Sequence, residues 1–212
     1  MTPAEGHLID PSARVDPSAQ VDPGAEIGAE SAVWQLTHIR GGARIGAGCV
    51  IGRGAYIGPD VHIGDHCKIQ NFALVYEPAR LADGVFIGPA VVLTNDQYPR
   101  AINPDGSRKD ADDWDLVGVT IDEGAAIGAR AVCVAPVRIG AWAMVAAGST
   151  VIHDVPAFAL VAGTPARRVG WVGRSGRRLE NAGEGRWVCP SSGEEYLEEG
   201  ERLALEVPPN DA

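Results

Sequence analysis

Aliphatic residues recur at every sixth position along the first half of the chain. The run of fifteen begins at Ile9 and ends at Leu93 without a miss, and the position four residues after each of the first fourteen is always small or slender. A period of six fits neither an amphipathic helix nor a flat strand. A solenoid does produce it, because three hexads form one triangular coil whose sides are short strands with the aliphatic residue inward. The pattern therefore predicts an all-β fold, a parallel β-helix whose coils stack about 4.8 Å apart.

Glycine, aspartate and proline gather between the inward positions, where the chain has to turn. Ile45-Gly-Ala-Gly and Ile57-Gly-Pro-Asp are two such phrases. These residue types suit corners at which the backbone adopts positive φ. Pro78 occupies a corner position and cannot adopt positive φ, so we expect an irregular corner after Val75.

The six-residue register is interrupted once. The next member after Leu93 is Ile121, and this spacing of 28 residues is not a multiple of six. The polar segment 95–116 must therefore leave the solenoid as an excursion loop, and loops of this length are usually functional or disordered. The hexads then continue to Val151. We expect a β-helix with its loop over residues 1–157 and a C-terminal extension over 158–212.

Composition narrows the choice of partners and compartment. The chain has 212 residues, 45% of them apolar, and a formal net charge of −10. This charge argues against nucleic acid or an anionic membrane as the main partner. The first residues show no basic region followed by an apolar stretch, and no later segment approaches eighteen apolar residues. We expect a cytoplasmic protein.

The four cysteines fall into two groups. Cys49, Cys67 and Cys133 lie at inward hexad positions, so we expect reduced core residues. Cys189 belongs to Trp187-Val-Cys-Pro-Ser-Ser-Gly, which together with Trp171-Val-Gly-Arg-Ser-Gly looks like a pair of metal knuckles with three thiols missing. Structural zinc needs four ligands, so we expect no metal and interpret the extension as a degenerate zinc-ribbon-like packing segment. The acidic stretch 194–201 is expected to be a solvated surface.

Several phrases outside the repeat carry a resemblance to a known family. They are Trp34-Gln-Leu-Thr-His-Ile, Lys68-Ile-Gln-Asn, Val75-Tyr-Glu, Thr94-Asn-Asp-Gln-Tyr-Pro-Arg, Arg108-Lys109 and Gly163-Thr-Pro-Ala-Arg. With these phrases the chain resembles the hexapeptide-repeat acyltransferases, which have a left-handed parallel β-helix. Within that family it resembles the 3-N-acetyltransferases of nucleotide-linked 3-amino sugars. The resemblance implies a homotrimer that binds acetyl-CoA between adjacent β-helices and a UDP- or dTDP-linked amino sugar near the excursion loop, in surface polysaccharide or glycoside biosynthesis.

Two polar corner residues, Asn71 and Glu77, are the candidates for catalysis. Residues eighteen apart occupy equivalent places on successive coils, so Glu77 and Asn95 should stack about 5 Å apart at the backbone. Asn71 lies one hexad before Glu77, and in a trimer it would oppose Glu77 and Asn95 of a neighbour. Asn71 is suited to donate a hydrogen bond to the thioester oxygen, and Glu77 or Asp96 to hold an ammonium group. The alternative for Asn71 is a corner residue satisfied by the backbone.

Further residues are candidates for binding the two substrates. Those assigned to the nucleotide-linked sugar are Asn95, Asp96, Arg100, Arg108 and Lys109. Those assigned to acetyl-CoA are Ala129, Ala147 and Gly148, which would let pantetheine pass close to the coil, and Arg167 and Arg168, which would meet its phosphates. Phe72 and Gln35 stand where relatives often have asparagine and histidine, and either difference would change which sugar is accepted.

Three other functions remain open. An O-acetyltransferase of this fold needs a histidine base to activate a hydroxyl group, and the excursion has no histidine, while His38 should face outward near Arg40. A γ-carbonic-anhydrase-like hydratase needs three histidines on zinc, which the spacing of the five histidines does not suggest. The third alternative is a non-catalytic hexapeptide-repeat scaffold.

Overall fold

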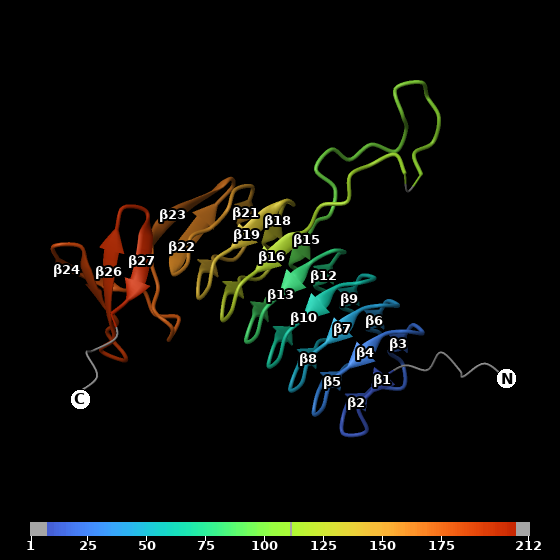
Figure 1. Ribbon diagram of the computed structural model, residues 1–212, viewed down its shortest axis with the longest axis horizontal. Coiled ribbons are helices and arrows are strands. Elements are labelled where there is room, and N and C mark those ends of the chain that lie inside the picture. The colour runs from blue at the N-terminus through green and yellow to red at the C-terminus, as the bar shows by residue number, and fades with distance from the viewer. Residues whose placement is uncertain (1–7, 111, 207–212) are drawn as a thin grey trace.

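The chain winds into a long triangular solenoid of short strands (Figure 1). The structure, a computed structural model, describes residues 8–110 and 112–206. Within these residues there is no helix, and hence none that is long and apolar enough to cross a membrane.

Three sheets form the sides of the solenoid, and successive strands pass from one sheet to the next. Their strands are parallel, except that the last strand of sheet B pairs antiparallel with its neighbour. Sheet A contains β1 (Leu8–Ile9), β4 (Glu26–Ile27), β7 (Arg44–Ile45), β10 (His62–Ile63), β13 (Arg80–Leu81), β16 (Val119–Ile121) and β19 (Val137–Ile139). Sheet B contains β2 (Arg14–Val15), β5 (Ala32–Val33), β8 (Val50–Ile51), β11 (Lys68–Ile69), β14 (Phe86–Ile87), β17 (Ala126–Ile127), β20 (Met144–Val145), β22 (Ala159–Gly163) and β23 (Ala166–Trp171). Sheet C contains β3 (Gln20–Val21), β6 (His38–Ile39), β9 (Tyr56–Ile57), β12 (Leu74–Val75), β15 (Val92–Leu93), β18 (Val132–Cys133) and β21 (Thr150–Val151).

The core lies inside the coils, where the six-residue pattern predicts it. Ile51 pairs with Ile69 on the next coil, and Ile69 pairs with Ile87, so residues eighteen apart are neighbours. The inward aliphatic residues from Ile27 to Leu93 are buried. Ile9 and its equivalents on the first described coil are only partly buried, because no earlier coil covers them within residues 8–110. The predicted all-β parallel solenoid is confirmed.

Most corners turn through positive φ at the third residue after the inward position. Gly54 has positive φ at this place, and so do the non-glycine residues Asp60 and Phe72. Pro78 occupies the same place without positive φ, and the Glu77–Pro78 peptide bond is cis. The expected irregularity of this corner is confirmed.

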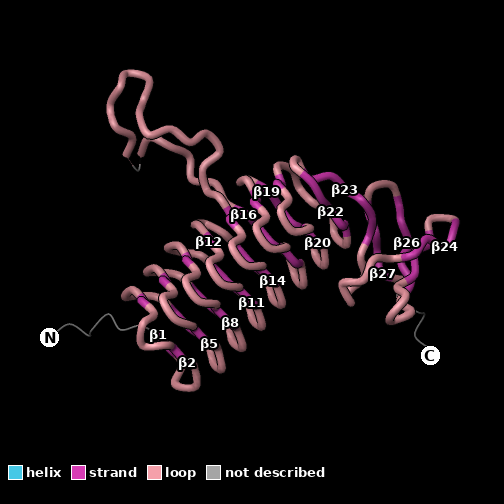
Figure 2. The backbone as a smooth tube through the Cα atoms, turned by 180° about the vertical axis from the view of Figure 1, so that it is seen from behind, coloured by secondary structure: helices cyan, strands magenta, loops and turns pink. Residues whose placement is uncertain are grey.

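The excursion leaves between β15 and β16 and stands away from the solenoid (Figures 1 and 2). Leu81 pairs with Ile121, so the coil register resumes unchanged after the loop. The outer part of the loop is a small hairpin in which Ile102 bridges Arg108. The Asp113 carboxylate accepts hydrogen bonds from Asn103 and from the backbone N–H of Asp110, which gives the loop internal order.

The C-terminal extension covers the last coil. Strands β22 and β23 continue sheet B to Trp171, so this sheet extends beyond residue 157, where we expected the β-helix to end. An antiparallel sheet follows, made of β24 (Glu180–Gly183), β25 (Arg186–Val188), β26 (Glu195–Glu199) and β27 (Arg202–Leu205). The rings of Phe158 and Tyr196 meet at 5.3 Å between the two parts. The extension thus caps an end that would otherwise expose apolar surface.

The acidic stretch is more structural than predicted. Glu194 pairs with Arg174, and this pairing holds the pKa of the Glu194 carboxyl below its usual range. Glu198 accepts hydrogen bonds from Arg168 Nη1 at 3.1 Å and from Trp187 Nε1 at 2.8 Å. The expectation of a purely solvated surface is therefore wrong for Glu194 and Glu198, because both bind side chains of neighbouring segments.

The cysteines lie in two environments. Cys49, Cys67 and Cys133 are buried and free, as predicted, and burial raises the pKa of Cys133 to about 12. Cys189 is buried where the two knuckle-like phrases meet, with its Sγ 3.1 Å from Ser175 Oγ. Burial works against the thiolate there, but hydrogen bonds from serine hydroxyls outweigh it and lower the pKa of Cys189 to about 6.

A matched pair on β11 tests the packing of the coils. Ile69→Ala removes a fully buried side chain, so we expect the free energy of unfolding in urea to fall by about 2–5 kcal/mol. Lys68→Ala, on the same strand and exposed, should change it by less than about 0.5 kcal/mol. Equal losses for the two variants would contradict the inward assignment.

Candidate functional site

The predicted catalytic residues lie at two different corners of one coil. We call the turn after a sheet B strand corner BC, and the turn after a sheet C strand corner CA. Asn71 follows β11 and is at corner BC, whereas Glu77 follows β12 and is at corner CA. Because β12 and β15 pair in register, Glu77 and Asn95 occupy equivalent positions on successive coils, as predicted.

Three polar side chains at the second residue after an inward position bind the coil before. Asp65 Oδ1 accepts a hydrogen bond from the backbone N–H of Ala47 at 2.7 Å, and Asp83 Oδ1 accepts one from Asp65 at 2.7 Å. In each case the oxygen also lies across a glycine of the earlier coil, Gly46 or Gly64, where a Cβ would collide with it. We call this recurring arrangement the corner ladder.

The side-chain oxygen of Asn71 takes part in the corner ladder, whereas its side-chain nitrogen does not. Its Oδ1 accepts a hydrogen bond from the backbone N–H of Arg53 at 3.0 Å. The alternative interpretation, that Asn71 is a corner residue whose side chain is satisfied by the backbone, is therefore correct for its oxygen. Its Nδ2 has no hydrogen-bond partner among the described residues, and Asn71 is exposed, so the amide N–H groups are available to a bound molecule.

Glu77 takes the same ladder position but lacks its donor. Its Oε2 is buried without a hydrogen-bond partner among the described residues, and it lies across Gly58, where a Cβ would be only 2.4 Å from it. The residue eighteen positions earlier is Pro59, which has no N–H to give. The Glu77 carboxylate is thus held in place by the corner while receiving no hydrogen bond within the described residues.

A polar and aromatic cluster lies on earlier coils along sheet C and corner CA. Asp22 contacts His38 Nε2 at 3.1 Å and Arg40 Nε at 2.8 Å, and the His38 hydrogen bond, supported by Arg40, holds the pKa of Asp22 below its usual range. Arg40 also donates to the Tyr56 hydroxyl at 3.2 Å. The rings of Tyr56 and Tyr76 are 5.3 Å apart. Sequence reasoning placed His38 outward near Arg40 correctly but missed the cluster.

The remaining acceptor candidates are spread along the excursion. Asn95 and Asp96 lie at its root, where Asp96 Oδ1 accepts a hydrogen bond from the backbone N–H of Tyr98 at 2.7 Å. Arg100, Arg108 and Lys109 belong to the excursion, the segment that stands away from the solenoid (Figure 1). Residues 95–116 contain six aspartates against these three cations. The excursion therefore carries a net negative charge in spite of these cations.

The acetyl-CoA candidates line corner BC on later coils. Ala129, Ala147 and Gly148 follow β17 and β20, at the same corner as Asn71, and a Cβ on Gly148 would meet nothing within 4 Å. The tip between β22 and β23 joins this track, because Gly163 N–H donates to Ser149 Oγ at 3.2 Å. Corner BC thus carries small residues on its last coils, at the same edge of the solenoid as Asn71.

The two arginines assigned to phosphates differ sharply. Arg167 is exposed, and its side chain bonds only the carbonyl of Ala166, at 2.9 Å, among the described residues. Arg168 binds Glu198 and lies 4.2 Å from the centre of the Trp171 ring. Arg167 is therefore free to meet a ligand, whereas Arg168 is engaged in attaching the C-terminal sheet.

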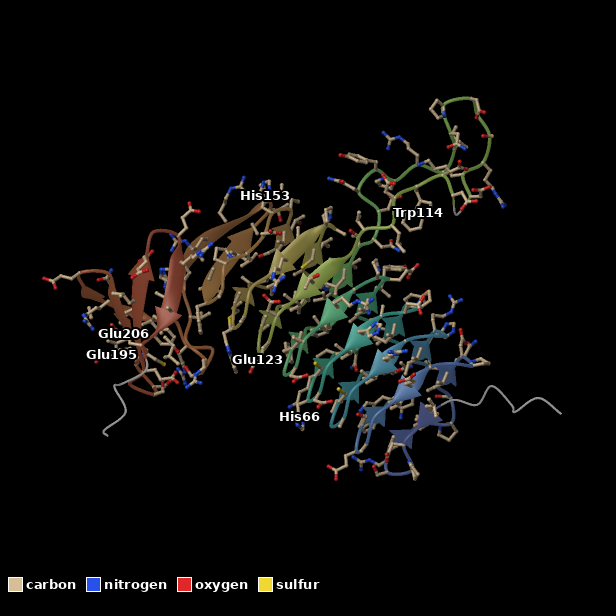
Figure 3. All side chains as sticks on the ribbon, in the orientation of Figure 1. His66, Trp114, Glu123, His153, Glu195 and Glu206 are labelled. Carbon is tan, nitrogen blue, oxygen red and sulfur yellow. The ribbon has the colours of Figure 1, made fainter. Side chains whose placement is uncertain are left out.

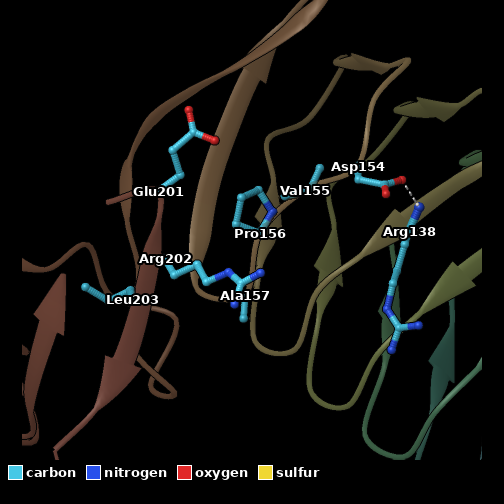
Figure 4. Close-up of a pocket in the computed structure, with 8 residues that line it drawn as sticks. All are labelled: Arg138, Asp154, Val155, Pro156, Ala157, Glu201, Arg202 and Leu203. Atoms are coloured by element: carbon cyan, nitrogen blue, oxygen red, sulfur yellow. Dashed lines mark hydrogen bonds between the residues drawn. The ribbon is translucent and has the colours of Figure 1, made fainter. Parts of the chain in front are cut away.

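A pocket of about 460 Å³ lies elsewhere, between the last coil and β27 (Figure 4). Pro156 and Leu203 contribute apolar walls, and Arg138 and Arg202 contribute charge. The Arg138 guanidinium is already paired with Asp122 at 2.9 Å. None of the predicted site residues lines this pocket.

The histidines of the described residues are scattered along the solenoid. His66 and His153 lie on coils far apart (Figure 3). Residues 8–110 and 112–206 contain no group of three or more histidine, cysteine, aspartate or glutamate side chains that could hold a metal ion.

Comparison with known proteins agrees with the fold. The family model described as bacterial transferase hexapeptide (six repeats) matches residues 42–76, and the model described as hexapeptide repeat of succinyl-transferase matches residues 118–152. These segments fall within the coils on either side of the excursion. The chain is a hexapeptide-repeat protein.

Relatives of this hexapeptide-repeat protein match it over short stretches. It is 52% identical over 52 residues to a dTDP-3-amino-3,6-dideoxy-α-D-galactopyranose 3-N-acetyltransferase of Aneurinibacillus thermoaerophilus, covering 24% of this chain and 27% of the relative. It is 34% identical over 100 residues to serine acetyltransferase 4 of Arabidopsis thaliana, covering 47% and 22%. The chain thus matches about a quarter of the length of these curated relatives.

A solved structure agrees over a longer span. An N-acyltransferase from Bacillus cereus, in complex with dTDP and coenzyme A, matches 80% of this chain and 87% of its own, with 20% identity and a TM-score of 0.51. At this identity the match supports the fold of the hexapeptide-repeat protein.

Adjacent arginines on β23 test the distinction drawn above. Arg168→Ala removes an ion pair and a cation–π contact, so we expect the free energy of unfolding to fall by about 1 kcal/mol. Arg167→Ala should change it by less than about 0.5 kcal/mol. Urea denaturation measures both, and a larger loss for Arg167→Ala would contradict the assignment.

Proposed function

We propose that this hexapeptide-repeat protein is an acetyl-CoA-dependent N-acetyltransferase that modifies the 3-amino group of a UDP- or dTDP-linked amino sugar, in surface polysaccharide or glycoside assembly. The observation that carries the proposal is the Glu77 carboxylate, which is fixed at corner CA beside the root of the excursion and receives no hydrogen bond from the described residues. A carboxylate in this state favours a ligand that brings N–H donors and positive charge, as an amino sugar does. The name of the Aneurinibacillus thermoaerophilus relative specifies a substrate of this class.

Corner BC supports the second substrate. Ala129, Ala147 and Gly148 leave space beside the coil for a narrow chain such as pantetheine, whose amides would bond backbone groups. The exposed Arg167 lies in β23, next to this track, where it would meet a phosphate. Acetyl-CoA would supply the acetyl group as a thioester, and it would keep the reaction in the cytoplasm, where this co-substrate is made.

The chemistry assigns a separate task to each corner residue. The acceptor ammonium is held by Glu77 and gives up one proton to water, and its neutral nitrogen then attacks the thioester carbon. Negative charge develops on the carbonyl oxygen, and the free Nδ2 of Asn71 donates a hydrogen bond to it. The C–N bond forms, the C–S bond breaks, and the departing thiolate takes the second proton from nitrogen.

A second copy of the chain completes this site in the proposal. Asn71 and Glu77 lie at opposite ends of one side of the solenoid and project from different corners. Corner BC of one subunit placed against corner CA of its neighbour brings the two together, and repetition of this contact closes a homotrimer. The cations of the excursion, Arg100, Arg108 and Lys109, would then reach the nucleotide diphosphate across the subunit boundary.

The paired His38 and Asp22 favour one alternative, an O-acetyltransferase. His38 Nε2 lies 3.1 Å from Asp22, so its Nδ1 can serve as a base for a hydroxyl acceptor. The choice of acceptor therefore separates the two functions.

A thiol-release assay tests the proposal. The wild-type protein, given acetyl-CoA and a panel of UDP- and dTDP-linked sugars, should release thiol with 3-amino sugars and not with their 3-hydroxy analogues. Asn71→Ala should lower kcat by about 10²–10³ because it removes the donor to the developing oxyanion.

Asp83→Asn is the matched control, because Asp83 holds the same ladder position at the third corner, the turn after a sheet A strand. It should leave kcat unchanged. Thiol release with hydroxyl acceptors alone would refute N-acetyl transfer, and full activity in Asn71→Ala would refute the role of Asn71.

A further inference from the structure

Glu77 occupies a position of the corner ladder but receives no backbone hydrogen bond, and the reason lies in the preceding coil. Asp65, Asn71 and Asp83 each accept a backbone N–H from the residue eighteen positions before them. For Glu77 that residue is Pro59, which has no N–H, and Oε2 is left buried across Gly58 without a partner among the described residues. A buried oxygen without a donor is costly. The second oxygen of the same carboxylate, Oε1, is neither buried nor hydrogen-bonded among the described residues, so a donor that arrives from outside the chain can reach the carboxylate there.

An aromatic surface adjoins this carboxylate. Tyr76 immediately precedes Glu77, and its ring lies 5.3 Å from the ring of Tyr56. The Glu77 carboxylate lies across Gly58, two residues after Tyr56. The side chains of Tyr76 and Glu77 therefore both contact residues 56–58 of the preceding coil. Together with Tyr56 they place a carboxylate and two aromatic rings at corner CA.

The neighbouring cations do not neutralise Glu77. Arg40 and His38 both bind Asp22, at 2.8 Å and 3.1 Å. Arg40 also donates to the Tyr56 hydroxyl, which fixes that ring from below. The cluster is thus rigid and internally paired, while the carboxylate above it receives no ion pair within the described residues.

We infer that Glu77, Tyr76 and Tyr56 form the binding site for the ring and the charged amine of the acceptor, and that Pro59 keeps this site open by withholding a backbone donor. This inference rests on the proposed function, which it extends to the class of ring that binds and the residues that select it. An ammonium group offers three N–H donors to the carboxylate, and the faces of the tyrosine rings attract both its charge and the apolar face of the ring that carries it.

Equilibrium binding tests the selection without requiring turnover. Calorimetry compares a dTDP-linked 3-amino-3,6-dideoxyhexose with its 3-hydroxy analogue on the full chain. The wild type should bind the amine at least about tenfold more tightly, because hydrogen bonds to charged groups are worth this much. The ratio should fall to about one in Glu77→Gln.

Asp65→Asn is the control for Glu77→Gln, because the Asp65 carboxylate already has a backbone donor and lies at another corner. It should keep the wild-type ratio. Equal affinities in the wild type, or an unchanged ratio in Glu77→Gln, would overturn the inference. Tyr76→Leu should weaken the binding of both ligands alike, and Tyr76→Phe should bind them as the wild type does. Wild-type affinity in Tyr76→Leu would show that the Tyr76 ring does not contact the ligand.

Pro59→Ala tests the role of the proline. The new amide at position 59 should be protected from hydrogen exchange by the Glu77 carboxylate, and the preference for the amine should fall several-fold as the two donors compete. An unprotected amide with an unchanged preference in a folded variant would overturn the role of Pro59 and leave that of Glu77.

The thiol-release assay separates this inference from the proposed function. Selective binding of the amine without any thiol release would refute acetyl transfer and leave the binding site standing. Thiol release from 3-amino sugars with no contribution from Glu77 to binding would refute the site and leave the enzyme.

Discussion

Backbone hydrogen bonding between coils, which pairs strand residues eighteen apart, is the constraint on which the rest of the molecule depends. Gly52 N–H donates to the Ile69 carbonyl of the next coil at 2.7 Å. One coil earlier, Trp34 N–H donates in the same way to the Ile51 carbonyl at 2.9 Å. Because this pairing repeats without slippage, each inward side chain packs directly on its equivalents above and below. The excursion does not disturb it, since Leu81 and Ile121 still pair in register.

The same constraint decides where chemistry is available. Side chains on the strands either fill the core or cover a flat side, so polar groups can vary mainly at the corners and in the excursion. It also separates Asn71 from Glu77, because one whole side of the solenoid lies between corner BC and corner CA. A site that uses both residues needs two copies of the chain, which is why the proposed function and the proposed trimer are linked.

The fold and the placement of corner residues were predictable from the sequence, because both follow from counting by six and by eighteen. The stacking of Glu77 and Asn95 is one such result. The missing donor at Glu77 could also have been predicted by counting, since Pro59 stands eighteen residues earlier. That prediction needed one further fact, that side chains of the corner ladder accept hydrogen bonds from the preceding coil.

Other features depend on contacts that no period describes. The capture of Arg168 by Glu198 joins strands that belong to different sheets, so it follows from how the C-terminal sheet docks on the last coil. The engagement of Glu194 by Arg174 has the same origin. The acidic stretch was therefore misjudged as solvated, because composition alone does not show which cations a carboxylate will meet.

Complementation between inactive variants tests most directly whether the two corners form one site shared between copies. Asn71→Ala and Glu77→Gln subunits, each inactive alone, are unfolded together in equal amounts, refolded and assayed for thiol release. If corner BC of one subunit meets corner CA of another, random assembly leaves about a quarter of the sites with both residues intact, and about a quarter of the wild-type activity returns. A mixture that stays inactive, although it forms mixed oligomers, would contradict the shared site.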